Sequence, residues 1–209
     1  GSASDCNFDL SLLKWGGKTL LEADSILGKN DSLRSRWKDV YARLTDFLFD
    51  PDEGWMIGRN RPYDMSHRHY SHLLMAYPLY LVNRDQPGGK EMIVKSVNHW
   101  QSIKGALEGY SRTGAASLYA SVGEGDKALA YLEEFMQKSM QPNTCYQEGG
   151  NPVIETPLSA ARALLDMALQ SWGGKIRIFP AIPGIWRDFA FDNLLAEGAF
   201  EVSAGRKNG

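Results

Sequence analysis

The sequence predicts a mainly α-helical protein built from helical hairpins, with short β-strands at its C-terminal end. Over most of the chain, apolar residues recur at the three- and four-residue intervals of a helix, separated by Gly- and Pro-containing breaks. After residue 174 the pattern changes to the polar/apolar alternation of a strand. Because the paired helices lack a fixed repeat of about 34 or 40 residues, a toroid of inner and outer helices is favoured over a solenoid.

Four helices are expected in the first half of the chain, over residues 8–27, 33–47, 70–81 and 93–107. Gly28 ends the first helix, and Pro51 and Gly54 follow the second. The apolar positions, helix by helix, are Phe8, Leu12, Trp15, Ala23 and Leu27; Leu33, Trp37, Val40, Leu44 and Phe47; Tyr70, Leu73, Leu74, Tyr77 and Leu81; and Ile93, Val97, Trp100 and Leu107.

Three further helices are expected near residues 115–122, 129–135 and 158–172. The last is marked by Leu158, Ala161, Leu165, Ala168 and Trp172. Residues 175–179 and 199–202 are predicted as strands, and Pro180 and Pro183 exclude a helix between them. We therefore predict a partial toroid over residues 1–174 and the start of a β-rich region over residues 175–209.

The composition narrows the range of partners. The 209 residues carry a formal net charge of -2, and their Lys and Arg residues are scattered, which gives no electrostatic surface for nucleic acid or an anionic membrane. No apolar run reaches the about 18 residues that a membrane helix needs. We expect neither a nucleic-acid nor a membrane partner. Cys6 and Cys145 fit no metal or redox spacing, and are expected to be buried thiols.

Three of the four histidines lie in one run, His67-Arg68-His69-Tyr70-Ser71-His72. Imidazoles three residues apart could bind a metal, but no HExxH motif or cysteine pair completes a zinc site. The same side chains could simply cap a helix. The interpretation favoured here is a polar pocket floor that donates hydrogen bonds to sugar hydroxyls, with no metal and no cofactor.

Two carboxylates lie in the segment before the last predicted helix. Glu155 occupies the start of that helix, where the helix dipole alone would favour a negative charge by about 0.3–1 kcal/mol. Glu148 lies in the same loop, and a pair of carboxylates in one cleft is typical of glycoside hydrolysis. Three aromatic residues expected in loops or at a helix end, Trp55, Tyr63 and Trp172, are candidate platforms for a sugar ring.

From His67 onward the order of motifs resembles glycoside hydrolase family 95, the α-L-fucosidase type. The motifs, in chain order, are the His-Arg-His-x-Ser-His-Leu run, Thr113-Gly114, Gly125-Asp126-x-Ala128, Pro142-Asn143, Ile154-Glu155, Leu169-Gln170-Ser171, Gly174-x-Ile176, Phe179-Pro180-Ala181-Ile182-Pro183 and Trp186. The resemblance implies the second half of an (α/α)6 toroid and a periplasmic or extracellular enzyme. Its parent would be an inverting hydrolase of α-linked L-fucose or a related sugar in glycans.

In such an enzyme a glutamate is the general acid, and water is activated by an asparagine supported by an aspartate. The resemblance places the supporting carboxylate at Glu155, and Arg68 and His69 in the sugar pocket. The acid and the asparagine lie upstream of the present residues, so the fragment alone is expected to be inactive. Glu155 replaces an aspartate, and its extra methylene would displace the carboxylate oxygens. The chain also departs from the family pattern at Ala115, Thr156-Pro157-Leu158-Ser159 and Trp172. These further departures imply a divergent branch acting on another sugar, such as an L-galactoside, or lacking activity.

Two other interpretations remain open at this stage. The chain could be a non-catalytic carbohydrate-binding or structural remnant of such an enzyme, or a helical scaffold that binds other proteins. A scaffold would need a long apolar or charged groove, and no such stripe stands out. Because half a toroid leaves inner-helix surface uncovered, we also expect a homodimer formed through this surface, or marginal stability.

Overall fold

The computed structural model describes residues 3–209, which form two compact units. The first unit contains Gly1–Asp64 and Ser71–Val82, and the second contains Met65–Tyr70 and Asn83–Gly209. Each unit has its own buried residues, and the two are described separately below.

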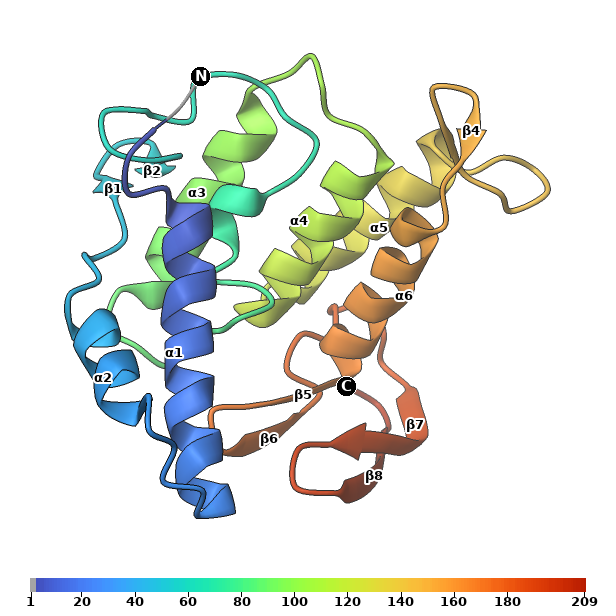
Figure 1. Cartoon of the computed structure of the whole chain (residues 1–209). Coiled ribbons are helices and arrows are strands. Elements are labelled where there is room, and N and C mark those ends of the chain that lie inside the picture. The colour runs from blue at the N-terminus through green and yellow to red at the C-terminus, as the bar shows by residue number, and fades with distance from the viewer. Residues whose placement is uncertain (1–2) are drawn as a thin grey trace. The chain divides into compact units, whose positions relative to one another are not determined.

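The first unit is built on a helical hairpin of α1 (Asn7–Leu27) and α2 (Arg34–Ala42), as the sequence predicts (Figure 1). Helix α1 ends because Gly28 adopts the left-handed conformation, with φ of 60°, which glycine reaches without a steric penalty. Asp24, near the end of α1, forms an ion pair with Arg34 at the start of α2. This contact joins the two helices beside their connecting turn.

The start of α1 is attached to a two-stranded sheet, β1 (Phe49–Asp50) and β2 (Gly54–Trp55), through the buried side chain of Asn7. The Asn7 amide nitrogen donates to the carbonyl oxygens of Leu48 and Met56, each at 2.8 Å. Its oxygen accepts from the Leu48 N–H at 2.9 Å. A polar side chain can be fully buried here because its donors and its acceptor are satisfied.

The expected helix over residues 70–81 was wrong. Only a single 3-10 turn, η1 (Ser71–Leu73), forms in this segment, and turns follow it. Pro78 cannot donate to a helical hydrogen bond and disfavours helical conformation in the residue before it, and Tyr80 adopts a positive φ of 49°. The second expected helix is also shorter than predicted, since α2 ends at Ala42.

Four helices dominate the second unit: α3 (Gly89–Ser102), α4 (Gly109–Ser121), α5 (Gly125–Lys138) and α6 (Glu155–Ala168). Helix α4 packs against both α5 and α6 (Figure 1). Nearly all of its residues are buried, and most are small, including Gly114, Ala116, Ser117 and Ala120. Small side chains let neighbouring backbones approach closely, so α4 serves as the central helix of this unit.

Aromatic side chains fill the space between α3 and α4. The Trp100 side chain is fully buried, and its ring lies 5.6 Å from that of Tyr70. Tyr70 stacks on Tyr110 at 5.8 Å. A Cβ at Gly114 would lie 2.4 Å from the Tyr70 ring, so only glycine admits the ring at this position.

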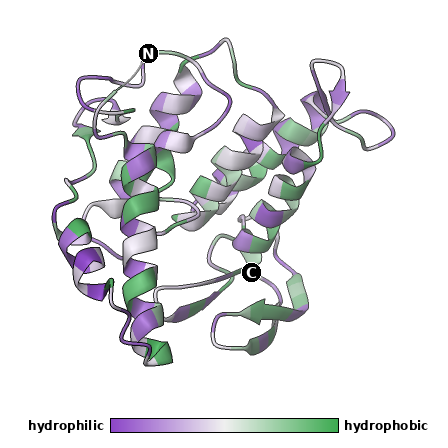
Figure 2. Cartoon of the chain, in the orientation of Figure 1, coloured by the Kyte–Doolittle hydropathy of each residue, from purple (hydrophilic) through white to green (hydrophobic). Residues whose placement is uncertain are grey.

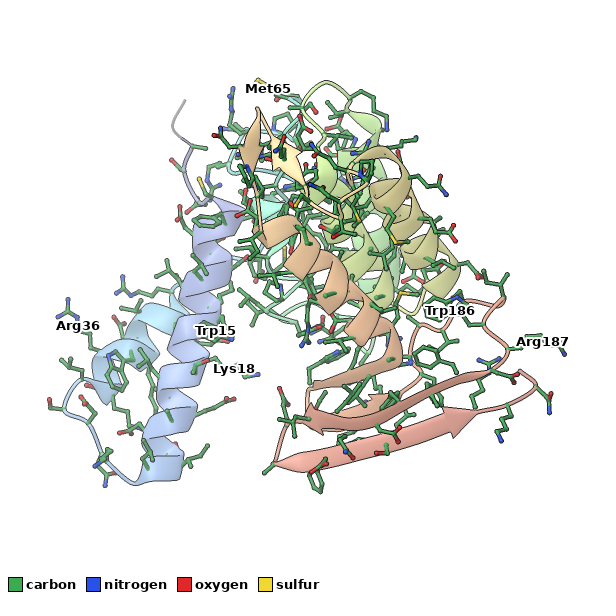
Figure 3. All side chains as sticks on the ribbon, turned by 90° about the vertical axis from the view of Figure 1, so that its right-hand side faces the viewer. Trp15, Lys18, Arg36, Met65, Trp186 and Arg187 are labelled. Atoms are coloured by element: carbon green, nitrogen blue, oxygen red, sulfur yellow. The ribbon has the colours of Figure 1, made fainter. Side chains whose placement is uncertain are left out.

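The C-terminal region forms two antiparallel hairpins, β5 (Leu169–Trp172) with β6 (Lys175–Ile178) and β7 (Phe189–Ala196) with β8 (Phe200–Arg206). Strands β6 and β8 confirm the two predicted strands, although β8 is longer than expected. Figure 3 shows Trp186 beside β7, where its ring stacks on Phe189 at 5.4 Å.

Strand β5 begins where the seventh predicted helix was expected to continue. Helix α6 ends at Ala168, and the buried Gln170 then donates hydrogen bonds to the carbonyl oxygens of Ala120 and Asp166, at 2.7 and 2.9 Å. These bonds hold β5 against the end of α4. The helical pattern therefore predicted the existence of α6 correctly and placed its end four residues too late.

Both units leave apolar helix surface exposed. In α1, Leu13, Trp15 and Ile26 are 51%, 45% and 84% exposed, and Figure 2 shows hydrophobic residues along this helix. In α6, Leu158 and Leu165 of the predicted apolar stripe are 61% and 43% exposed. These two leucines thus face outward, while Ala168 of the same stripe is buried, together with Ala163 and Met167. Within residues 3–209, no helix is long and apolar enough to cross a membrane.

Candidate functional site

A pocket of about 490 Å³ lies in the second unit at the start of α6. Three separate segments form it: the loop that carries the histidine run, the residue before α4, and the chain leading into α6. Its ionisable side chains are three carboxylates and one guanidinium. The lining residues are Arg68, Glu108, Glu148, Gly149, Pro152, Val153, Ile154 and Glu155.

The loop carrying Arg68 is held by the helices beside it. The Ser111 hydroxyl donates to the Arg68 carbonyl oxygen at 2.9 Å, and the Trp100 indole N–H donates to the His67 carbonyl oxygen at 2.9 Å. The His69 ring packs edge-on against Tyr110, with centroids 5.1 Å apart. Helices α3 and α4 therefore fix the backbone of this loop on both sides of Arg68.

Glu148 contacts the guanidinium of Arg68 directly and is largely buried. Its side chain is 11% exposed, and its Oε2 lies 3.5 Å from Arg68 Nε. Its Oε1 accepts a hydrogen bond from the Tyr146 hydroxyl at 2.8 Å. Burial, and then this hydrogen bond, raise the pKa of Tyr146 well above its ordinary value, so the phenol remains a donor at neutral pH.

Glu155 is the first residue of α6 and is exposed to the pocket. The helix dipole favours a carboxylate at this position. The next residue, Thr156, is fully buried, and Pro157 lies in the first turn, where its missing N–H leaves no helical hydrogen bond unmade. The buried threonine and the rigid proline fix the first turn from which Glu155 projects.

His69 lies beside the pocket and contacts two of the predicted site residues. Its backbone N–H donates to His67 Nδ1 at 3.1 Å, and Arg68 Nε lies 3.4 Å from its Nε2. Burial, followed by the positive charges of Arg68 and His67, lowers the pKa of His69, while the negative charges of Glu155 and Glu148 oppose this effect. The imidazole is therefore largely neutral at pH 7 and can both donate and accept hydrogen bonds.

The lowered pKa of His69 gives a testable pH dependence of stability. Between the ordinary histidine pKa of about 6.5 and the lower folded-state pKa, the unfolded chain binds more protons than the folded chain, so stability falls as the pH falls through this window. We expect His69→Gln to lose this part of the slope. Urea unfolding followed by circular dichroism at several pH values between about 5 and 8 measures it. An identical slope in both proteins would contradict the prediction.

The three aromatic platform candidates do not line this pocket. In the first unit, Trp55 is 2% exposed and packs on Phe49, and Tyr63 is 3% exposed and stacks on His72 at 4.3 Å. In the second unit, Trp172 is 4% exposed, follows the opposite end of α6 from Glu155, and is covered by the Arg177 guanidinium at 3.5 Å.

No group of three or more metal-ligating side chains gathers among residues 3–209. The expectation of buried cysteines was wrong for Cys145, which is an exposed free thiol, while Cys6 is free and half-buried. Sequence reasoning also missed two residues of the site, Glu108 and Tyr146. The available signals were the Tyr-x-Glu spacing of Tyr146 and Glu148, and the Glu-Gly pair at 108–109 that begins α4.

Comparison with protein families places this helical chain, with its carboxylate-lined pocket, among the glycoside hydrolases. Residues 2–156 match the glycosyl hydrolase family 95 catalytic domain, so the match covers well over half of the chain and ends in the first turn of α6. The chain therefore belongs to glycosyl hydrolase family 95. No individual curated protein matched the chain significantly.

Proposed function

We propose that this chain is the C-terminal half of the catalytic domain of an inverting, α-L-fucosidase-like enzyme, which acts on α-linked L-fucose or a related sugar such as L-galactose in glycans. The observation that carries the proposal is the pocket in which Arg68, Glu148 and Glu155 meet beside His69. It lies within the segment that belongs to the family.

In this proposal the residues in and beside the pocket support catalysis or bind the sugar. Glu155 supports an asparagine that activates the attacking water, and Arg68, His67 and His69 donate hydrogen bonds to sugar hydroxyls. Glu148 accepts hydrogen bonds from the sugar hydroxyls. An inverting enzyme needs a second, protonated carboxyl group about 6.5–9.5 Å from its base to leave room for water. We infer that this general acid lies upstream of the present residues and that the fragment alone is inactive.

The proposed fold is part of an (α/α)6 toroid over residues 1–174, followed by the start of a β-rich region over residues 175–209. The exposed apolar surfaces of α1 and α6 support it, because each would be covered in a closed ring of inner and outer helices. In the fragment we propose that this surface mediates a homodimer. A periplasmic or extracellular location is part of the same proposal.

Calorimetric titration and hydrolysis assays test this function. The 209-residue chain is titrated with methyl α-L-fucoside and methyl α-L-galactoside, and the longer protein that contains it is assayed with the matching aryl glycosides. We expect binding by both proteins and hydrolysis by the longer one alone. Binding without hydrolysis would favour a carbohydrate-binding remnant, for which the glutamate at position 155 is the supporting observation. Neither binding nor hydrolysis would overturn the proposal.

A further inference from the structure

One hydroxyl group connects the start of α4 with a carboxylate of the pocket. The Tyr146 oxygen accepts a hydrogen bond from the Gly109 backbone N–H at 2.8 Å and donates one to Glu148 Oε1 at 2.8 Å. The Gly109 N–H is one of the first-turn donors that a helix leaves without an internal partner. The Gly109 N–H therefore fixes the position of the Tyr146 oxygen, and the phenolic O–H donates its hydrogen bond to Glu148.

The ring that carries this hydroxyl is fixed on its other sides. Tyr146 is 4% exposed and packs edge-on against Phe135 of α5, with centroids 5.5 Å apart. A Cβ at position 109 would lie 2.6 Å from the Tyr146 hydroxyl oxygen, so the absence of a side chain at Gly109 makes the contact possible. Tyr146 is thus a rigid donor that does not itself line the pocket.

Glu148 is held at both oxygens, by a buried donor on one side and by a more exposed one on the other. Its Oε1 accepts a hydrogen bond from the Tyr146 hydroxyl, while Oε2 forms an ion pair with the guanidinium of Arg68, whose side chain is 48% exposed. A carboxylate oxygen can accept more than one hydrogen bond. Both oxygens therefore keep acceptor capacity for hydroxyl groups that enter the pocket.

We propose that Tyr146 is a positioning residue: its hydroxyl, fixed by the Gly109 N–H, holds Glu148 in the orientation in which the carboxylate accepts hydrogen bonds from a sugar. The role of Glu148 toward sugar rests on the function proposed above. The orientation of Glu148 by Tyr146 does not depend on it.

Tyr146→Phe tests the proposal because it keeps the ring and its packing and removes only the hydroxyl. We expect the Kd of the chain for methyl α-L-fucoside to rise about tenfold, the effect of one hydrogen bond to a charged group. Tyr119→Phe is the matched control. Tyr119 is also buried, at 2% exposed, and donates to the side chain of Asn98 at 2.5 Å, but it does not line the pocket. We expect it to lower the melting temperature and leave the Kd unchanged.

A double-mutant cycle separates positioning from a general loss of structure. If Tyr146 acts through Glu148, Tyr146→Phe weakens binding no further once Glu148→Ala is present; additive effects of the two changes would overturn the proposal. Should Tyr146→Phe not fold, Gly109→Ala replaces it in the cycle, since the added Cβ displaces the hydroxyl.

The carboxyl-carbon NMR resonance of Glu148 distinguishes this proposal from the proposed function. A change of that resonance in Tyr146→Phe but not in Tyr119→Phe supports the positioning role, whether or not a sugar binds, and an unchanged resonance overturns it. Failure of the unmodified chain to bind either methyl glycoside overturns the proposed function instead.

Discussion

On the function proposed above, replacing Glu155 by Gln in the longer protein is expected to lower kcat for the aryl α-L-fucoside about a thousandfold, within the range of about 10²–10⁴ that a group supporting proton transfer contributes. The amide keeps the size of the side chain and the first turn of α6. It cannot stabilise the positive charge that develops on the activating asparagine as this residue accepts a proton from the attacking water. Because ground-state contacts with the sugar are retained, KM should change little.

Glu155→Asp is the informative companion to this change. It keeps the charge and removes one methylene, which restores the residue that the family resemblance implies at this position. If the longer side chain displaces the carboxylate oxygens, the aspartate variant should be at least as active as the unmodified enzyme. Full activity of Glu155→Gln would show that Glu155 does no more than stabilise the start of α6.

Truncating Trp100 should have the largest effect on stability. The side chain projects from α3 and is fully buried beside Tyr70, and its indole N–H donates a hydrogen bond to the His67 carbonyl oxygen. Trp100→Ala is expected to lower the free energy of unfolding by about 3–5 kcal/mol, the usual range for large core aromatics. Since domains are stable by only about 5–15 kcal/mol, much of the second unit should then unfold at moderate temperature.

Urea unfolding followed by far-UV circular dichroism measures this loss without relying on tryptophan fluorescence. Trp15→Ala is the matched control, because Trp15 is 45% exposed on α1 and belongs to the first unit. Its loss should be much smaller. Equal losses in the two variants would mean that Trp100 is not central to the packing of the second unit.

Helices with strong apolar periodicity and clear ends could be predicted from the sequence. Helix α1 with its glycine end, and α5, form close to where their patterns indicate. Helix α3 also forms after its turn, but it ends at Ser102, before Leu107 of the predicted pattern. The segment over 70–81 shows the limit of this reasoning. Tyr70, Leu73 and Tyr77 of its apolar pattern are buried as expected of a core segment, but Pro78 prevents the helix that their spacing suggests.

The end of α6 could not be predicted from local pattern, because the competing interactions are distant in sequence. Gln170 donates to the Ala120 carbonyl oxygen, 50 residues away, and β5 pairs with β6. These contacts outweigh a helical pattern that continues as far as Trp172. The same reason explains why Tyr146 was missed, since its contact with Gly109 spans 37 residues.

The candidate site was predicted in part. Arg68, Glu148 and Glu155 were identified from the sequence and meet in one pocket. Trp55, Tyr63 and Trp172 were chosen because they were expected in loops or at a helix end, a criterion that does not separate exposed rings from rings buried by loops and strands. Exposure is a property of tertiary packing, and single-residue context does not determine it.

The pocket's three segments lie far apart along the chain, and this arrangement has a consequence for the order of folding. Helices α4 and α5 are neighbours in sequence and can associate early, whereas the contact of Arg68 with Glu148 must close a long loop. The pocket is therefore complete only in the fully folded second unit. Any sugar that binds there raises the free energy of unfolding of this unit, by about 2.7 kcal/mol when the sugar concentration is a hundred times its Kd.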